Sequence, residues 1–208
     1  MAEVAVFLAP GFEEIEALTV VDYLRRANVE VRTISVPEED SPRNEIVVVG
    51  SHGITVIADN TLRDFIERSE KRAPDAIFFP GGMPGASNLA ANQYLFQLAT
   101  KMDRKGKLVA AICAAPAVVL AQTGILANRK WTCYPGMENE LPKYCGGEIK
   151  ARDLMENSTH IKDAPFVLDN NVLTGKGPGT AEQFAMKLVE ILTDSETARK
   201  IHDGSCQR

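Results

Sequence analysis

Short apolar runs alternate along the chain with segments of helical periodicity. Val4–Ala9 and Ala76–Phe79 are continuously apolar, which is typical of strands buried on both faces of a parallel sheet. Between them, Glu14–Ala27 repeats apolar residues at helical spacing. Strands that alternate with helices predict an α/β fold, with helices covering both faces of a mainly parallel central sheet.

The same pattern continues to the end of the chain and shows no repeat, low-complexity segment or linker. We therefore expect one domain over residues 1–208, with its core at about 4–192, and we interpret Pro37–Asn44 as a surface loop. Further strands are predicted at Val29–Val36, Ile46–Val49, Ile54–Ala58, Lys107–Ile112, Trp131–Cys133, Glu148–Arg152, Phe166–Leu168 and Val172–Thr174, and further helices at Thr61–Glu70, Gln93–Arg104, from about Pro116, at Thr180–Leu192 and as a short C-terminal extension at Ser195–His202.

Composition and charge narrow the classes of function. The chain carries 23 basic and 28 acidic residues, a net charge of −5, which argues against binding to nucleic acid. No apolar run approaches the roughly 20 residues that a membrane span requires. Met1–Glu3 offers no basic leader segment, so we expect a cytoplasmic protein with reduced thiols. The cysteines and histidines show no zinc-type spacing, and we predict neither a metal nor a cofactor.

Cys113 is the strongest candidate for a nucleophile. It lies where a predicted strand meets a predicted helix, between Ala111 and Ala115. Small residues at these offsets permit the sharp turn of a nucleophile elbow, and a helix N-terminus lowers the pKa of a thiol. The alternative is a small buried core cysteine, which is the commoner case. The other three cysteines are interpreted as structural or incidental.

Two glycines, Gly81 and Gly82, follow another predicted strand. Without side chains in the way, their backbone N–H groups can converge on one oxygen, as an oxyanion hole requires. Taken alone, the same residues also fit an ordinary turn.

Three carboxylates open the first predicted helix. Glu13 and Glu14 are interpreted as solvated residues of the first turn, where they complement the helix dipole. Glu16 falls instead on a face expected to be partly buried, and burial would raise its pKa. Glu16 is therefore the candidate to share or donate a proton to Cys113.

Gly177 and Pro178 belong to a glycine-rich turn between a predicted strand and the last long helix. The spacing does not match that of a phosphate-binding loop, so we reject nucleotide binding. We expect this turn to pack beside the site.

Together these segments resemble one known family. Ala9–Ala17, Phe79–Gly85, Ala110–Pro116 and Lys176–Thr180 occur in the order and register of the ThiJ/PfpI superfamily, and the chain is most similar to its DJ-one, ThiJ-like branch. The resemblance runs from about residue 4 to about residue 192. Four separated motifs in register are far more specific than one.

The resemblance implies a flavodoxin-like three-layer sandwich and a homodimer. It also implies that Cys113 is the reactive cysteine, that Glu16 hydrogen-bonds it, and that the backbone N–H groups of Gly82 and Ala114 form the oxyanion site. Members of the family are described as glutathione-independent glyoxalases, as proposed deglycases, as oxidative-stress sensors and as chaperones.

The chain departs from the family pattern at several positions. Peptidase-like members carry histidine where this chain has Ala114, and a thiolate without an adjacent base protonates a leaving amine poorly, so we do not expect peptidase activity. Tyr134 stands where many relatives have histidine. Phenols titrate near ~10, so this side chain can orient a substrate but is a poor base. His52 replaces a ligand-facing arginine, and Arg25–Arg26 match a paired arginine or form a solvated helix end.

Two functions follow from these residues. The first is an enzyme that converts small α-oxoaldehydes such as methylglyoxal or glyoxal, or glycated substrates, to 2-hydroxy acids through Cys113 and Glu16. The second is a non-catalytic redox sensor or redox-regulated chaperone that works through oxidation of Cys113.

Overall fold

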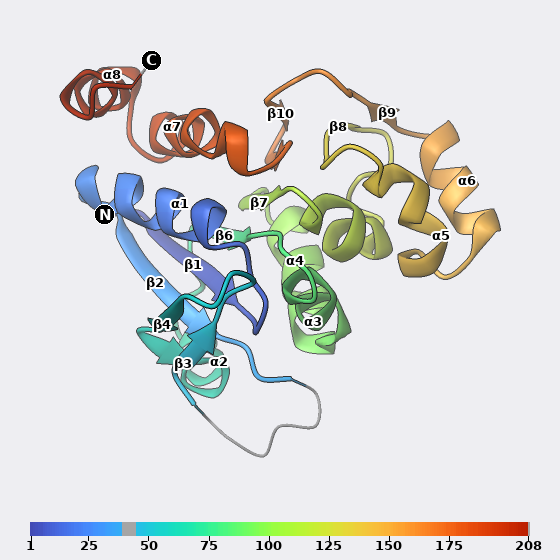
Figure 1. Ribbon diagram of the computed structural model, residues 1–208, viewed down its shortest axis with the longest axis horizontal. Coiled ribbons are helices and arrows are strands. Elements are labelled where there is room, and N and C mark those ends of the chain that lie inside the picture. The colour runs from blue at the N-terminus through green and yellow to red at the C-terminus, as the bar shows by residue number, and fades with distance from the viewer. Residues whose placement is uncertain (39–44, 208) are drawn as a thin grey trace.

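A central seven-stranded sheet organises the computed structural model, which describes residues 1–38 and 45–207 (Figure 1). The strand order is β10-β11-β7-β6-β1-β2-β5, and every neighbouring pair is parallel except β10 with β11. The mainly parallel sheet predicted from the sequence is thereby confirmed. Its strands are β1 (Glu3–Leu8), β2 (Glu30–Ser35), β5 (Asn60–Thr61), β6 (Ala76–Phe79), β7 (Leu108–Ile112), β10 (Phe166–Asp169) and β11 (Val172–Gly175).

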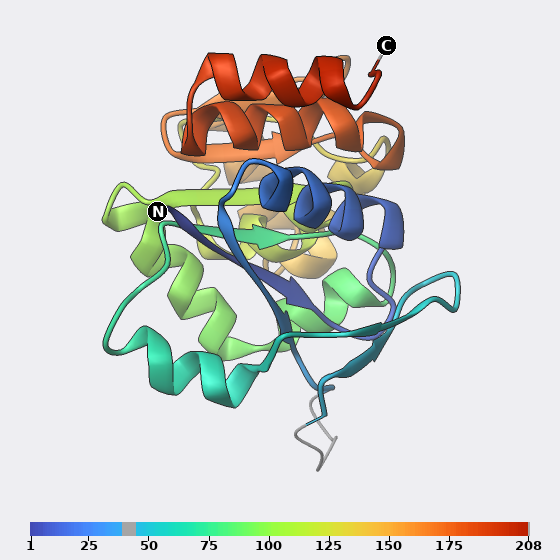
Figure 2. The same cartoon turned by 90° about the vertical axis from the view of Figure 1, so that its left-hand side faces the viewer.

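Helices cover both faces of this sheet, so the molecule has three layers (Figure 2). One face packs against α1 (Glu14–Arg26) and α7 (Ala181–Leu192), with α8 (Ser195–Gly204) outside α7. The other face packs against α2 (Leu62–Ser69) and α4 (Gln93–Arg104). The sequence predicted all five helices.

The apolar runs form the central strands because both of their faces are buried. Every residue of β1, β6 and β7 is buried. The rings of Phe7 and Phe79 stack between neighbouring strands with centroids 5.4 Å apart. On the opposite face, the ring of Phe78 contacts that of Phe184 from α7 at 5.6 Å. Each such buried side chain stabilises the fold by roughly 1.5–3 kcal/mol.

Two small sheets lie beside the main one. β3 and β4 form the predicted antiparallel hairpin, and β8 pairs in parallel with β9. The remaining elements are short. They are β3 (Val47–Val49), β4 (Thr55–Ile57), β8 (Lys130–Trp131), β9 (Thr159–His160), α3 (Gly85–Ala91), η1 (Pro116–Leu120), η2 (Ala121–Thr123), η3 (Met137–Glu140), α5 (Leu141–Tyr144), α6 (Glu148–Glu156) and η4 (Pro178–Thr180).

One predicted strand is wrong. Glu148–Arg152 forms the first turns of helix α6. The segment is rich in good helix formers, and Ala151 and Leu154, three residues apart, are its buried side chains. Gly147, at φ +107°, precedes the first residue of this helix. The apolar residues of the segment therefore lie on one face of a helix and do not alternate as in a strand.

Most of the predicted loop Pro37–Asn44 lies outside the described residues, which resume at Glu45. Within the part of the chain that the structure describes, no helix combines the length and the apolar character needed to cross a lipid bilayer.

Candidate active site

Four loops that the sequence singled out meet at one edge of the sheet. Strands β11, β7, β6 and β1 are consecutive neighbours in the sheet and parallel. Their carboxyl ends therefore lie side by side, which is where α/β sheets bind ligands. The loops that leave these ends carry the glycine turn at Gly177, the nucleophile candidate Cys113, the pair Gly81–Gly82 and the start of α1.

Cys113 sits on a sharp turn between β7 and the π-helical turn η1. Its φ angle is +62°, a left-handed conformation that a residue with a Cβ adopts only when the surrounding structure holds it there. The backbone is held by the Cys113 N–H, which donates to the Gly175 carbonyl at 2.9 Å. Ala111 and Ala115 are fully buried on either side. This geometry matches the predicted nucleophile elbow, and the side chain is half-buried rather than sealed in the core.

Two backbone N–H groups face the Cys113 sulfur. They belong to Gly82 and Ala114, and both interactions lower the pKa of the thiol. Gly82 has φ +83°, and a Cβ there would collide with the backbone of Gly11 and Glu13. A glycine is required at this position so that the N–H can approach the sulfur. An oxygen on a carbon bonded to this sulfur would find both donors close by.

Glu16 lies under Cys113 and is completely buried. Its Oε2 accepts a hydrogen bond of 2.7 Å from the Gly81 N–H, and its Oε1 has no hydrogen-bond partner of good geometry among the described residues. Gly81 is in contact with both groups, since a Cβ on it would lie 2.6 Å from Cys113 Cβ and 2.8 Å from Glu16 Oε2. The expected role of Gly81 as an oxyanion donor is therefore corrected, because its N–H is engaged by Glu16.

Burial raises the pKa of Glu16 to about 7, although the Gly81 N–H and the Cys113 thiol lower it and nearby Glu13 raises it further. Burial likewise raises the pKa of the Cys113 thiol, and the Glu16 carboxyl raises it further. The sequence predicts a lowered thiol pKa from the helix N-terminus. In the structure the N–H groups of Gly82 and Ala114 do lower the thiol pKa, but burial and the Glu16 carboxyl act in the opposite direction. Transfer of the thiol proton to an ionised Glu16 carboxylate would leave a thiolate on Cys113.

Tyr134 and the glycine turn complete the rim of the site. The Tyr134 N–H donates to the Cys113 carbonyl at 2.8 Å, and the residue is 48% exposed. A Cβ on Gly177 would lie 3.1 Å from the Tyr134 ring, so the turn packs directly against it. Pro178 is half-buried and opens η4. The structure thus brings Gly177 and Tyr134 to the edge where Cys113 lies.

Glu13 and Glu14 are buried, which corrects the expectation that they are solvated. Glu14 accepts hydrogen bonds from the His52 N–H at 2.7 Å and the Ile54 N–H at 3.3 Å, and its Oε2 lies 3.0 Å from His52 Nδ1. Burial raises the pKa of Glu14. The hydrogen bonds outweigh this effect, with the largest contribution from the His52 side chain, and hold the pKa at about 2. Glu14 therefore fastens the β3–β4 hairpin to the start of α1. His52 thus helps to hold the β3–β4 hairpin against α1.

Arg25 and Arg26 lie at the opposite end of α1. Arg25 forms an ion pair of 2.7 Å with Asp59, and Arg26 forms one of 2.6 Å with Asp22. Both side chains are about half exposed. Of the two interpretations of this pair, the structure favours a solvated helix end.

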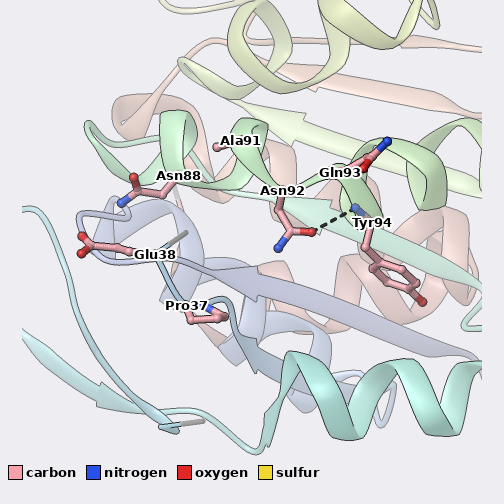
Figure 3. A pocket seen from close by; sticks show the side chains of 7 residues that line it. All are labelled: Pro37, Glu38, Asn88, Ala91, Asn92, Gln93 and Tyr94. Atoms are coloured by element: carbon pink, nitrogen blue, oxygen red, sulfur yellow. Dashed lines mark hydrogen bonds between the residues drawn. The ribbon is translucent and has the colours of Figure 1, made fainter. Parts of the chain in front are cut away.

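A separate surface hollow of about 370 Å³ lies between α3, the start of α4 and the end of β2 (Figure 3). Its polar groups serve the fold, since the Asn92 side chain caps α4 by accepting from the Tyr94 N–H at 3.1 Å and Asn88 donates to the Pro10 carbonyl at 3.0 Å. Neither Cys113 nor Glu16 lines this hollow. The candidate catalytic residues therefore lie at the sheet edge and not in this hollow.

The fold and this edge define a class of protein: an α/β sandwich with a cysteine on a strained strand–helix turn above a buried carboxyl. Residues 2–191 match the model of the DJ-1/PfpI family, and the chain belongs to that family. The resemblance inferred from the sequence motifs is confirmed.

Several characterised proteins are similar along nearly the whole chain. Protein dj-1beta of Drosophila melanogaster is 31% identical over 96% of this chain and 94% of its own length. A protein of Caenorhabditis elegans named glutathione-independent glyoxalase DJR-1.2 is also 31% identical, over 93% of this chain and 90% of its own. DJ-1 homolog B of Arabidopsis thaliana is 33% identical, but this chain spans about 40% of its length.

Solved structures agree with the observed fold. A mutant of a DJ-1 superfamily protein from Salmonella typhimurium superposes with a TM-score of 0.83 and 32% identity, covering both chains completely. Oxidized DJ-1 of Toxoplasma gondii superposes with a TM-score of 0.80 and 33% identity, covering all of this chain and 99% of its own.

Proposed function

We propose that this protein is a cysteine-dependent, glutathione-independent glyoxalase that converts small α-oxoaldehydes, methylglyoxal and glyoxal, to 2-hydroxy acids. One observation carries the proposal: a buried carboxyl with a pKa near 7 lies against a thiol held on a strained turn. A proton carrier works best when its pKa is close to the working pH, and Glu16 meets that condition. The name of the nematode relative supports the same activity.

The first step is addition to the aldehyde. The Cys113 sulfur bonds to the aldehyde carbon, while its proton passes to the Glu16 carboxylate. The electrons of the C=O bond move to oxygen, and the N–H groups of Gly82 and Ala114 stabilise the developing negative charge. Glu16 then returns its proton to this oxygen, which leaves a hemithioacetal and an ionised carboxylate.

The second step moves hydrogen between the two carbons. The Glu16 carboxylate removes the proton from the sulfur-bearing carbon and delivers it to the neighbouring carbonyl oxygen, so that an enediol forms. Glu16 then takes the hydroxyl proton of the sulfur-bearing carbon and delivers it to the neighbouring carbon, which gives a 2-hydroxy thioester on Cys113. Water then attacks the thioester carbon, the 2-hydroxy acid leaves, and the sulfur regains its proton. The same residue thus acts as acid and base in turn.

The test compares lactate formation from methylglyoxal by the wild type and three variants. Cys113→Ser is expected to lose activity by at least about 100-fold, and Glu16→Gln by about 100- to 10,000-fold. Cys145→Ser, which alters another buried free cysteine, is the matched control and should keep the wild-type rate. An inactive wild type, or an active Cys113→Ser, would contradict the proposal.

We propose deglycation as an extension of the same chemistry. Methylglyoxal adducts on protein thiols and amines release the free aldehyde, so the two activities need separation. Lactate formation from a preformed adduct is measured with and without an excess of an aldehyde scavenger. Deglycation is supported where lactate forms at the same rate in both, and rejected where the scavenger abolishes it.

A second candidate function is redox sensing through Cys113. Two equivalents of peroxide oxidise the thiol to a sulfinic acid and leave two waters. Glu16, which burial keeps protonated up to about pH 7, can donate a hydrogen bond to the oxidised sulfur. The T. gondii relative is described as oxidized. Mass spectrometry after mild peroxide, showing two added oxygens confined to Cys113 in a protein without aldehyde turnover, would favour sensing over catalysis.

We also propose that the protein is a homodimer and that it works in the cytoplasm. The outer face of the β3–β4 hairpin exposes Val47, Val49 and Ile57, and cross-strand pairing sets Val47 beside Ile57. Ile57 is 70% exposed. An apolar cluster of this kind on the surface favours association, and a second copy of the chain offers the same face.

A further inference from the structure

A second cluster of reactive side chains lies behind the rim of the site. Cys133, Glu138 and His160 each bring one ligand atom to within 4.8 Å of the other two. Nothing in the spacing of these residues along the chain suggested a metal site. None of the three residues takes part in the proposed glyoxalase mechanism.

The pairing of β8 with β9 brings the two most distant members together. Trp131 and His160 are partners in this parallel pair, and their rings lie 4.6 Å apart. Cys133 follows Trp131 by two residues, just beyond the end of β8. The result is a distance of 3.5 Å between Cys133 Sγ and His160 Nε2.

This distance fits two ligands of one tetrahedral metal ion. Bonds of roughly 2.3 Å from zinc to sulfur and 2.0–2.1 Å to nitrogen, at a tetrahedral angle, separate the two ligand atoms by about 3.5 Å. The hydrogen bond from a thiol to an imidazole nitrogen has a similar length, so the distance alone does not decide between the two. The Glu138 carboxylate, with an oxygen within 4.8 Å of both atoms, adds a third ligand atom that a thiol–imidazole hydrogen bond does not need.

The charges and the burial of the three groups also suit a divalent cation. A Cys133 thiolate and the Glu138 carboxylate together balance two positive charges. His160 adds an imidazole nitrogen, one of the common ligands of zinc in proteins. Cys133 is buried at the base of the cluster, while Glu138 and His160 are half-buried, which leaves a path for the ion to enter.

We propose that Cys133, Glu138 and His160 form a binding site for a zinc-class divalent cation, with a fourth position left for water. On binding, the sulfur–metal bond forms as the Cys133 proton leaves to solvent, so affinity falls as the pH is lowered. His160 Nδ1 is buried and has no hydrogen-bond partner among the described residues. Since such partners strengthen metal binding by about 10- to 100-fold, we expect moderate affinity.

The site is tied to the nucleophile by one residue. Tyr134, next to Cys133, donates its N–H to the Cys113 carbonyl at 2.8 Å. A bound ion would fix the segment 133–138 at both of its ends. The proposal stands independently of the glyoxalase activity, because binding is measured without any substrate.

The experiment titrates Zn²⁺, and then Co²⁺, into the full chain carrying Cys113→Ser, so that the reactive thiol does not contribute. We expect one equivalent of Zn²⁺ to bind, and the Co²⁺ form to show thiolate charge-transfer absorption and the visible bands of a tetrahedral ion. Adding Cys133→Ser should abolish both signals. His160→Gln and Glu138→Gln should each weaken binding by at least about 10-fold.

Cys145→Ser, in the same background, is the matched control and should bind as before, because Cys145 belongs to no such cluster in the described residues. Circular dichroism checks that each variant is folded. If Cys133→Ser does not fold, the His160 and Glu138 variants decide the question. Absence of stoichiometric binding, or binding that survives all three substitutions, would overturn the proposal and leave a thiol–imidazole hydrogen bond.

Discussion

Glu16 and Gly81 form the contact on which the candidate site depends: the Gly81 N–H donates to Glu16 Oε2 at 2.7 Å. The two residues are 65 positions apart in sequence: Glu16 lies in the first turn of α1, which follows β1, and Gly81 follows β6, the neighbour of β1 in the sheet. This hydrogen bond fixes one carboxyl oxygen and leaves the other for proton exchange with the thiol.

Gly81→Ala tests this contact. Its Cβ would lie 2.6 Å from Cys113 Cβ and 2.8 Å from Glu16 Oε2, so one of these groups must move. We expect a loss of about 1–3 kcal/mol in the free energy of unfolding and a large fall in turnover. Gly179→Ala, in η4, where an added Cβ would face open space, should change neither. Denaturant unfolding and lactate formation provide the measurements; a fully active Gly81→Ala would show that the contact is not needed.

The pH profile of kcat/KM should report on Glu16. The thiol gives up its proton only to an ionised carboxylate, and burial raises the pKa of Glu16 to about 7. Activity is therefore expected to rise with pH and to level off above an apparent pKa near 7. The residual activity of Glu16→Gln should lack this step. A profile that levels off near pH 4–5, the usual range of a carboxyl, would argue against this role.

Glu16 should also make the fold less stable as the pH rises. Its pKa is 4.5 as a model value and about 7 in the folded state, so the native protein binds more protons than the unfolded chain between these values. From about pH 5 to about pH 8, the wild type is expected to lose of the order of 3 kcal/mol of unfolding free energy relative to Glu16→Gln. Urea unfolding of both proteins at several pH values measures this difference, and parallel curves would contradict it.

The proposed dimer predicts that Ile57→Glu dissociates the protein. A carboxylate buried in the apolar hairpin face should raise the dimer dissociation constant by at least about 100-fold. Ile149→Glu, on α6, alters an isoleucine that is 75% exposed and should leave the dimer intact. Size-exclusion chromatography with light scattering gives the mass of each variant. A monomeric wild type would exclude the dimer. A dimer in both variants would show that the interface lies elsewhere.

The central strands and long helices were predictable because their signal is local. Strands buried on both faces are continuous apolar runs, and α1, α4 and α7 repeat buried positions at helical spacing. Glu148–Arg152 failed because its few apolar positions fit strand and helix alike, and helix propensity decided between them.

The site was predictable only in part. Motifs at the ends of strands identify Cys113, Glu16 and Gly82, because parallel strands bring their carboxyl ends to one edge. The burial of the thiol was not predictable, since it depends on side chains from several elements. The cluster at Cys133 and His160 left no signal in the sequence, because 27 residues and a two-residue strand pair connect its members.

The first turn of α1 carries two carboxyls with opposite tasks. Glu14, with a pKa near 2, stays charged across the whole physiological range and holds the hairpin in place. Glu16, with a pKa near 7, changes its charge within that range. A single helical turn thus combines a permanently charged anchor with a group that exchanges a proton. A fall in cellular pH would therefore reduce the catalytic activity of this protein and leave its fold unchanged.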